Sequence, residues 1–468
     1  MPETEVAAAN PLPDQGQGGL SLGDDALSDS IFEDTEPLEN ESGFSISGSI
    51  QARGTAQTRD DPAVENNQTL RDRIILEGKY KKAISVSALS DYLYFGSESR
   101  EDDYDLTLHE AKWEHLTNNY GLSIGKQIIR WGKTDQVSPV DTLNPEDFRE
   151  FILPDYEERK IPIWMADARF FSNYFTLEGV FIPFFKASKL HCFDTNWSIF
   201  GHLKNEMTGN LNSLSPAMQD YIETYIDNLT VHEKKPDHES EFAARLTTTI
   251  KQIDLGFTFH QRTEDNPYFK SFPVKNINVN GNMSGSNIES IFSTADFKNE
   301  DIEVEYKKTR TVGFEFETTW KNIGLRGEAV WNENESFLTS SLTSDRSPTL
   351  TYVVGADYTS SGNTYFNIQF MHFHIYDYSS EILYFDQDSV SLLGEISTDL
   401  VSDWLKGAVK YNVSLNNASH YVTPYLKYTY ITNLECIVGI SILGGDQDTW
   451  FGRYKDYDLC YINVTYRF

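Results

Sequence analysis

Apolar and polar side chains alternate along many short segments of the chain from Gly43 onward. Residues 242–250 are one example, and residues 253–260, 323–331 and 405–413 repeat the pattern. Because successive side chains of a strand point to opposite faces, each segment predicts a strand with one apolar and one polar face. Half-buried strands of a soluble sheet and strands of a membrane barrel share this pattern. The connections between the segments are therefore needed to distinguish these two architectures.

The connections are sorted by length. The alternating segments run to about 10 residues or more, which is the length that crosses a bilayer at a tilt. Short turns mostly alternate with longer, polar loops, as in outer-membrane barrels, whereas a soluble sandwich has no reason to sort its loops in this way. The short turns are at Thr117, Ser172, Lys251, Lys321, Ser360 and Thr432, and the longest loops are 132–160, 185–240 and 263–301.

We therefore predict an all-β protein, a transmembrane antiparallel β-barrel that occupies residues 42–468. Placing strands on the pattern gives about 18 of them, with 16 as the alternative because the boundaries at 71–95 and 387–400 are uncertain. Aromatic residues near the expected strand ends fit the girdles that such barrels place at the two membrane interfaces, although they suit a soluble core equally well. These residues are Trp320, Trp331, Tyr358, Tyr376 and Tyr430.

Composition and charge narrow the function. The formal net charge of −32 and the lack of clustered Lys and Arg make nucleic acid an unsuitable partner. The three cysteines are widely spaced and fit neither a disulfide framework nor a zinc site. Residues 1–41 are acidic and poor in bulky apolar side chains, and we expect a disordered periplasmic extension that could hold a partner there.

The beginning of the sequence has no basic and apolar stretch of the secretory type. We expect a bacterial outer-membrane protein whose signal peptide is absent from this sequence. Its expected partners are outer-membrane lipid and lipopolysaccharide, together with the machinery that inserts barrels. At the other end, Phe468 and Tyr466 lie on the apolar parity of the last segment, and a terminal Phe of this kind resembles the signal that this machinery recognises.

The most unusual loop is residues 130–163, which is punctuated by Pro and charged with both signs. It carries too many apolar residues for a solvated loop, so we expect residues 132–160 to fold into the lumen and constrict a channel; an ordered extracellular cap is the alternative. Asn144 is expected to cap a short helix with Pro145 at its first position. The expected constriction residues are Arg130, Lys133, Asp135, Asp141, Glu146, Asp147, Arg149, Asp155, Glu157, Glu158 and Arg159.

The polar parity of the other segments is expected to line the lumen, with half or more of its charges paired across neighbouring strands. The expected wall residues are Arg245, Asp254, Glu315, Arg326, Glu328, Lys406, Lys410 and Lys427. Carboxylates outnumber cations in the loop, so the pore should favour cations modestly unless the wall cations compensate.

The same stretch carries a family resemblance. The sequence "GKQIIRWGKTDQVSPVDTLNPEDFRE", continuing through "IPIWMADARFF", resembles the domain-of-unknown-function 1302 family of Gram-negative outer-membrane proteins and, more distantly, alginate-export-type porins. The resemblance covers residues 125–171 and implies a channel-like barrel. Some relatives are associated with exporters of lipids, so a component that works with an export partner is one alternative function.

Some features of the sequence bear on functions other than a channel. Ser215 and Pro216 start an expected helix in the loop 185–240, either packed over the mouth or docking a partner. The ten histidines are scattered along the sequence and show no grouping with a nucleophile, so we do not expect an enzyme or a cofactor. His372 and His374 could face one side of a strand, but no third metal ligand is evident, so no metal site is predicted. A structural sheath around a partner protein would need a wide, unplugged lumen.

Overall fold

The computed structural model describes residues 43–58, 68–81, 83–95, 102–193, 195–201, 211–236, 239–274, 279, 288–289, 292 and 301–468. Its main body is one closed barrel of 18 strands, in which each strand pairs antiparallel with the next and the last pairs with the first. The prediction of 18 strands is confirmed. The expected extension of residues 1–41 lies outside the described residues.

The uncertain stretches of the sequence resolve into three regular strands, β2, β3 and β17. The barrel strands are β1 (Phe44–Gln57), β2 (Gln68–Tyr80), β3 (Ile84–Tyr94), β4 (Asp103–Leu116), β5 (Tyr120–Gln127), β6 (Ile163–Phe171), β7 (Thr176–Ile182), β9 (Glu241–Ile250), β10 (Ile253–Thr263), β13 (Lys308–Trp320), β14 (Ile323–Leu338), β15 (Ser344–Thr359), β16 (Thr364–Ile375), β17 (Asp388–Val401), β18 (Leu405–Ser414), β19 (His420–Tyr428), β20 (Leu434–Gly444) and β21 (Leu459–Arg467).

The barrel is polar inside and apolar outside. On β21, Ile462 and Tyr466 are 49% and 44% exposed, whereas the intervening Asn463 and Thr465 are 8% and 7% exposed. Large apolar side chains on the outer faces of the other strands are exposed in the same way. This inverted pattern suits a wall between lipid and a wet lumen, and it confirms a transmembrane barrel. Among the described residues, no helix has the length and apolar character needed to cross a membrane.

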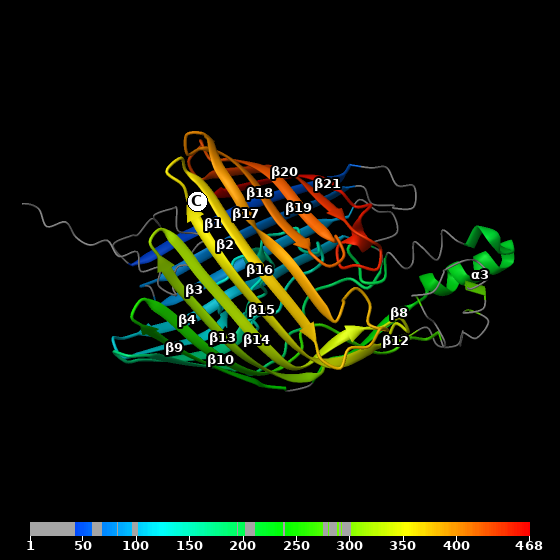
Figure 1. Ribbon diagram of the computed structural model, residues 1–468, viewed down its shortest axis with the longest axis horizontal. Helices are drawn as coiled ribbons and strands as arrows, with labels where there is room; N and C mark the ends of the chain where they lie inside the picture. The colour runs from blue at the N-terminus through cyan, green and yellow to red at the C-terminus, as the bar shows by residue number, and fades with distance from the viewer. Residues whose placement is uncertain are drawn as a thin grey trace, which may run out of the picture.

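The connections separate by length onto the two ends of the barrel. At the end that holds the C-terminus, they are between two and five residues long and include all six predicted turns. The opposite end carries the connections 128–162, 183–240 and 264–307 (Figure 1). We call this opposite end the long-loop end.

A small apolar core lies at the long-loop end, beyond the barrel wall. It includes a three-stranded sheet of β8 (Thr230–Lys234), β11 (Tyr268–Ser271) and β12 (Asp301–Glu305), and the helix α3 (Pro216–Asp227). Ile222 and Ile226 of α3 are buried in this core, and Ser215 precedes the helix as its N-cap residue. The predicted helix is confirmed. Figure 1 shows α3 and β12 at the end of the molecule away from the C-terminus.

Candidate functional site: a segment across the lumen

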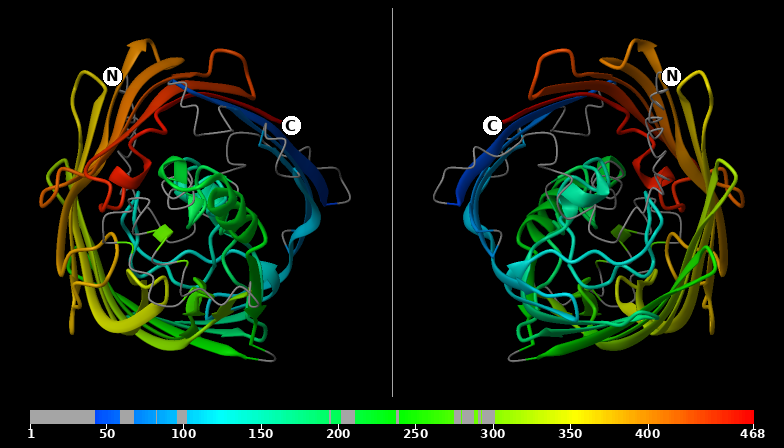
Figure 2. Two further views of the ribbon diagram at one scale, coloured as in Figure 1. Left: turned by 90° about the vertical axis from the view of Figure 1, so that its right-hand side faces the viewer. Right: turned by 90° about the vertical axis from the view of Figure 1, so that its left-hand side faces the viewer.

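Residues 128–162, which join β5 to β6, form the crossing segment. The side chain of Gln136 donates a hydrogen bond to the carbonyl oxygen of Gly394 on β17, and Asp155 pairs with Lys410 on β18. β17 is the ninth strand after β5 in the ring of 18, so these contacts lie half way round the barrel from the segment's origin. Figure 2, seen end-on, shows the cyan segment after β5 running across the interior. The segment therefore spans the whole width of the lumen.

The first wall residue that holds the crossing segment is Glu328 on β14, which is only 2% exposed. Its carboxylate accepts hydrogen bonds from the backbone N–H groups of Lys133 and Thr134 at 2.6 and 2.7 Å, and from that of Val140 at 3.2 Å. The hydroxyls of Thr134 and Ser138 also donate to it, at 2.7 and 2.9 Å. A single buried charge thus fixes residues 133–140, because charged acceptors make stronger hydrogen bonds than neutral ones.

Asp135 is the second contact with the far wall. Its carboxylate accepts hydrogen bonds from Arg326 at 3.1 Å, Asn367 at 2.6 Å and Gln369 at 3.1 Å. Arg326 also pairs with Asp357 on the neighbouring strand β15. The Asp135 side chain nevertheless remains 45% exposed, so its charge faces both the wall and the open lumen.

A buried ion-pair network fastens the segment on the near side, at β2 and β3. The Arg71 guanidinium donates to both carboxylate oxygens of Asp91 at 2.8 and 2.7 Å, to Asp147 at 2.8 Å and to Glu150 at 2.6 Å. Arg149 of the segment donates in turn to Asp91 at 2.8 Å and to Asp147 at 2.7 Å. These five groups form the Arg71 network, and all of them are buried.

Three ion pairs outside the Arg71 network also join the segment to the wall. Arg53 on β1 contacts Glu158 at 2.6 Å and lies 3.8 Å from Glu150. Lys410 contacts Asp155 at 2.5 Å. Lys133 lies 3.4 Å from Glu317 on β13. The segment is therefore held on both sides of the lumen by charge pairs that involve the wall.

Inside the segment, Asn144 takes a different role from the predicted one. Its side chain accepts a hydrogen bond from the Ile129 N–H at 3.0 Å and donates to the carbonyls of Gln127 and Ile161. These bonds clamp the two ends of the segment together, so the predicted helix from Asn144 is wrong. The one short helix of the segment is α1, Tyr156–Arg159.

Internal pairs complete the segment. Arg130 pairs with Glu157 at 2.6 Å, Arg159 with Glu146 at 3.0 Å, and Lys160 with Asp141 at 3.2 Å. The Tyr156 ring lies among three of these cations, with Lys160 Nζ 4.6 Å from its centroid. Cations are attracted to such a ring face, so the turn at α1 is held by charge as well as by packing.

Electrostatic interactions keep two buried groups of this segment ionised near neutral pH. Burial favours the neutral form of Asp147, but hydrogen bonds from Arg149 and the charge of Arg71 outweigh it and hold the pKa of the carboxyl well below its usual range. Burial likewise opposes the charge of Lys160, yet the Asp141 carboxylate raises the pKa of this ammonium above its ordinary value. Both groups are therefore charged partners and not proton donors near pH 7.

Most predicted wall residues lie on the inner face and are paired. Arg245 donates to Glu315 at 3.0 Å, and Lys427 pairs with Glu435. Asp254, which lies beside a short turn, accepts a hydrogen bond from Thr249 at 2.6 Å. Lys406 stands opposite Lys427 in the register of β18 and β19.

Sequence reasoning missed the basic residues of the first two strands. Arg53 on β1 is directly opposite Arg71 on β2. Like charges at such positions repel, and here carboxylates of the crossing segment lie against both of them. The alternate positions of Arg71 and Arg73 indicated that both side chains face the same side of a strand. Because the strand boundaries in this region were uncertain, the sequence did not show that this side is the lumen.

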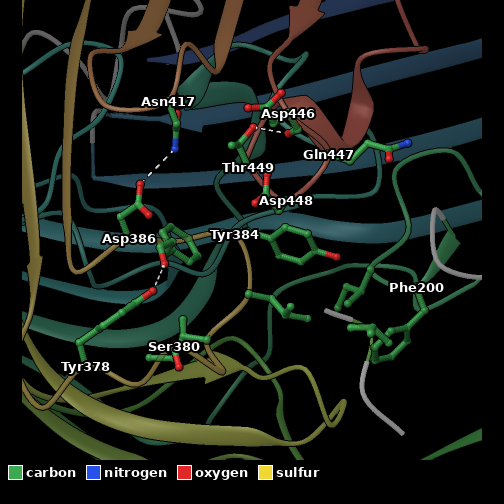
Figure 3. A pocket seen from close by; sticks show the side chains of 15 residues that line it. Phe200, Tyr378, Ser380, Tyr384, Asp386, Asn417, Asp446, Gln447, Asp448 and Thr449 are labelled. Carbon is green, nitrogen blue, oxygen red and sulfur yellow. Dashed lines mark hydrogen bonds between the residues drawn. The ribbon is translucent and has the colours of Figure 1, made fainter. Parts of the chain in front are cut away.

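A cavity of about 490 Å³ opens at the long-loop end, among five connections of the barrel. Figure 3 shows three carboxylates, Asp386, Asp446 and Asp448, around it, with the ring of Tyr384 between them and Phe200. Asn417 donates a hydrogen bond to Asp386 at 3.3 Å. We call this cavity the mouth pocket.

Aromatic side chains join the crossing segment to the connection between β20 and β21. The ring of Phe151 in the segment packs against Trp197, Phe451 and Tyr454. The Arg453 guanidinium lies over the rings of Tyr384 and Trp450 at 4.5 and 4.2 Å. Since Tyr384 also lines the mouth pocket, the pocket and the crossing segment belong to one continuous packed arrangement.

One solved structure similar to this chain is that of the outer membrane protein opdK from Pseudomonas aeruginosa, with a TM-score of 0.47 and 11% identity over 90% of this chain and 98% of that one. OccAB3 of Acinetobacter baumannii matches with a TM-score of 0.48 and 10% identity, covering 91% of this chain and 99% of that one. OccK2 (OpdF) of Pseudomonas aeruginosa, in complex with glucuronate, matches with a TM-score of 0.48 and 11% identity over 92% and 99%. No curated protein matches the sequence. The model of the family described as "Protein of unknown function (DUF1302)" matches residues 109–424, more than half of the chain, and the protein therefore belongs to that family.

Proposed function

We propose that the protein is a bacterial outer-membrane channel for small polar or charged solutes, and that residues 128–162 are its constriction. The observation that supports this most directly is the crossing segment, which is fastened to opposite sides of a polar lumen. A barrel with an apolar outer face and a polar interior is the architecture by which outer-membrane proteins pass hydrophilic solutes. Outer-membrane lipid and the barrel-insertion machinery are the partners that this proposal requires.

The charges of the constriction are nearly balanced by the wall. Arg53, Arg71 and Lys410 neutralise carboxylates of the segment, so most of its acidic surplus is already paired. Asp135 and Asp155 keep 45% and 61% of their side-chain surface exposed. We infer that these two groups give the constriction a modest cation preference.

The mouth pocket adds to this preference. Three carboxylates and an aromatic ring face one space of about 490 Å³. Carboxylates concentrate cations, and an aromatic face attracts a cation that has lost part of its water. The solute that fits both regions is a small organic cation, or a polar molecule with a cationic group.

The proposal is tested by replacing residues 136–156 with a short Gly/Ser linker and recording single channels in planar bilayers. The replacement removes the far-wall contact of Asp155 and the carboxylates of Asp147 and Glu150 that hold Arg71. We expect a larger conductance. Cation preference should weaken or reverse, because Arg71 and Lys410 would then face the lumen with fewer anionic neighbours.

The matched control replaces α3, Pro216–Asp227, with a linker of equal length, because this helix lies at the long-loop end and outside the crossing segment. Its removal should leave the conductance within the scatter of the intact protein. Unchanged conductance and selectivity after replacement of 136–156 would contradict the channel proposal. A sheath around a partner protein is disfavoured, because it needs a lumen without a segment fastened across it.

A further inference from the structure

Two histidines and one aspartate meet on the outside of the barrel, near the long-loop end. Nε2 of His372 and Nδ1 of His374, both on β16, lie 2.8 and 2.7 Å from the same carboxylate oxygen, Oδ1 of Asp388. Asp388 is the first residue of β17 and stands directly opposite His374 in the sheet register. The three ligand atoms lie within 4.8 Å of one another.

The histidines belong to the outer face of the wall and not to the lumen. They share the parity of Ile368, which is 50% exposed, whereas the intervening parity includes Gln369 and Ile375, both 0% exposed. Gln369 makes its contact with Asp135 inside the barrel. The cluster is thus separated from the crossing segment by the thickness of the sheet, and it is independent of the proposed channel.

The donor set is that of a transition-metal site. Two neutral imidazole nitrogens and one carboxylate oxygen are typical ligands of Zn²⁺, and imidazole also suits Cu²⁺. With metal–ligand bonds of about 2.05 Å and tetrahedral angles, neighbouring ligand atoms lie about 3.3 Å apart. The two nitrogen–oxygen separations are shorter than this by roughly half an ångström, and the Asp388 side chain, 51% exposed, can move by that distance.

Aromatic neighbours hold the two imidazole rings in place. The ring of Tyr376 meets that of His374 edge-on, with centroids 4.6 Å apart, and Tyr352 meets His372 in the same way at 5.1 Å. The ring nitrogens that face Asp388 are therefore fixed in direction before any ion arrives. Ligands held in this way lose little side-chain entropy when they bind a metal.

We propose that His372, His374 and Asp388 form a binding site for a divalent ion of the zinc and copper class on the outer rim of the barrel. The ring nitrogens that face Asp388 bind the ion through their lone pairs: in a neutral imidazole the proton moves to the other ring nitrogen, and a protonated imidazole releases one proton to the solvent. The imidazole side chains are 22% and 24% exposed, so the remaining coordination positions are open to water.

The test uses the full chain in detergent without any histidine tag, because a tag would itself bind the ion. Zn²⁺ is titrated by calorimetry in the presence of millimolar Mg²⁺, which occupies the diffuse carboxylate sites of a chain with net charge −32. We expect one saturable site per chain. His372→Ala or His374→Ala should weaken it by about 100-fold or more, and the double variant should abolish it.

His420→Ala is the matched control, since His420 is a histidine at the start of β19 whose Nδ1 contacts the carbonyl oxygen of Ala418. It should leave the affinity unchanged. Cu²⁺ electron paramagnetic resonance gives a second measurement, in which two coupled imidazole nitrogens are expected and are lost in the double variant.

The mobility of each variant on gels, unboiled and boiled, confirms that its barrel is folded. Three outcomes would overturn the proposal: binding that Mg²⁺ displaces, a Cu²⁺ spectrum of oxygen ligands alone, or equal affinity in the folded double variant. In each of these cases the three side chains form only a hydrogen-bonded clamp between β16 and β17. None of these outcomes bears on the proposed channel, because the bilayer recordings test the lumen, whereas the histidine cluster lies on the outer face of the wall.

Discussion

Substitution of Arg71 by Gln tests whether buried ion pairs hold the crossing segment in the lumen. The Arg71 side chain is 5% exposed and forms ion pairs with Asp91, Asp147 and Glu150. Among the described residues of the wall, it is the only cation that contacts all three of these carboxylates. Gln keeps most of the side-chain length but removes the charge. Three buried carboxylates then share less positive charge, which is unfavourable in a site with little water.

The size of the effect follows from the remaining partners. Removing one member of a buried ion pair typically costs about 3–5 kcal/mol. Arg149 still contacts Asp91 and Asp147, and Arg53 lies 3.8 Å from Glu150, so the lower end of that range applies. About 3 kcal/mol corresponds to roughly a 100-fold increase in the equilibrium constant for undocking of the segment. Arg71→Lys keeps the charge but loses the two-pronged contact with Asp91, and about tenfold is expected.

Hydrogen exchange followed by mass spectrometry measures this equilibrium directly. The reporting amides are those of Asp147, which donates to Arg159 O at 2.7 Å, and Ile161, which donates to Pro145 O at 2.8 Å. Peptides from β15 and β16 serve as the internal control and should keep their protection. The reasoning is refuted if Arg71→Gln changes the exchange of residues 145–161 by less than about threefold, or if the control strands lose protection equally.

Four other predictions follow from the same structure. Glu328→Gln should release residues 133–140 and raise the single-channel conductance, whereas Glu315→Gln, which disturbs a pair on the wall, should not. Because the pKa of Asp147 is lowered in the folded protein, docking of the segment should be independent of pH above about 5 and weaken as the pH falls below about 4, as hydrogen exchange can show. Ile368→Arg on the lipid face should cost roughly 2–4 kcal/mol in denaturant unfolding from vesicles, and Ile368→Leu almost nothing. Deleting Phe468 should reduce the amount of barrel inserted in the outer membrane but leave the inserted barrel similarly stable, because only one pair of backbone hydrogen bonds with Gly48 is lost; equal insertion would contradict its role in assembly.

The barrel could be predicted from the sequence because its pattern is local. Alternation and turn length act over about ten residues, and each strand repeats the same signal, so errors at single boundaries do not change the count by much. The helix at Pro216 was predictable for the same reason, since its N-cap residue and apolar stripe are contiguous in the sequence.

The site depended on contacts between distant residues. Arg71 and Glu150 are 79 positions apart, and nothing in either neighbourhood indicates the other. Asp388 completes the histidine cluster from the adjacent strand, 14 positions beyond His374, so a search along one strand did not find it. The helix predicted from Asn144 failed because local capping preference was overridden by hydrogen bonds to Gln127 and Ile161.

The way in which the crossing segment is fastened also constrains what it can do to a solute. A polar lumen offers little apolar surface, so a segment that must stay there in one position needs charged partners from the wall. Each wall cation that fastens the segment, as Arg53 does with Glu158, is electrically compensated and contributes little to the field in the passage. In the proposed channel, the field that a solute would meet is set by the incompletely covered charges, Asp135 and Asp155, and by the carboxylates of the mouth pocket. Asp135 and Asp155 hold the far side of the segment, whereas the Arg71 network holds the near side, so exchanging Asp155 should alter ion preference without undocking the Arg71 network.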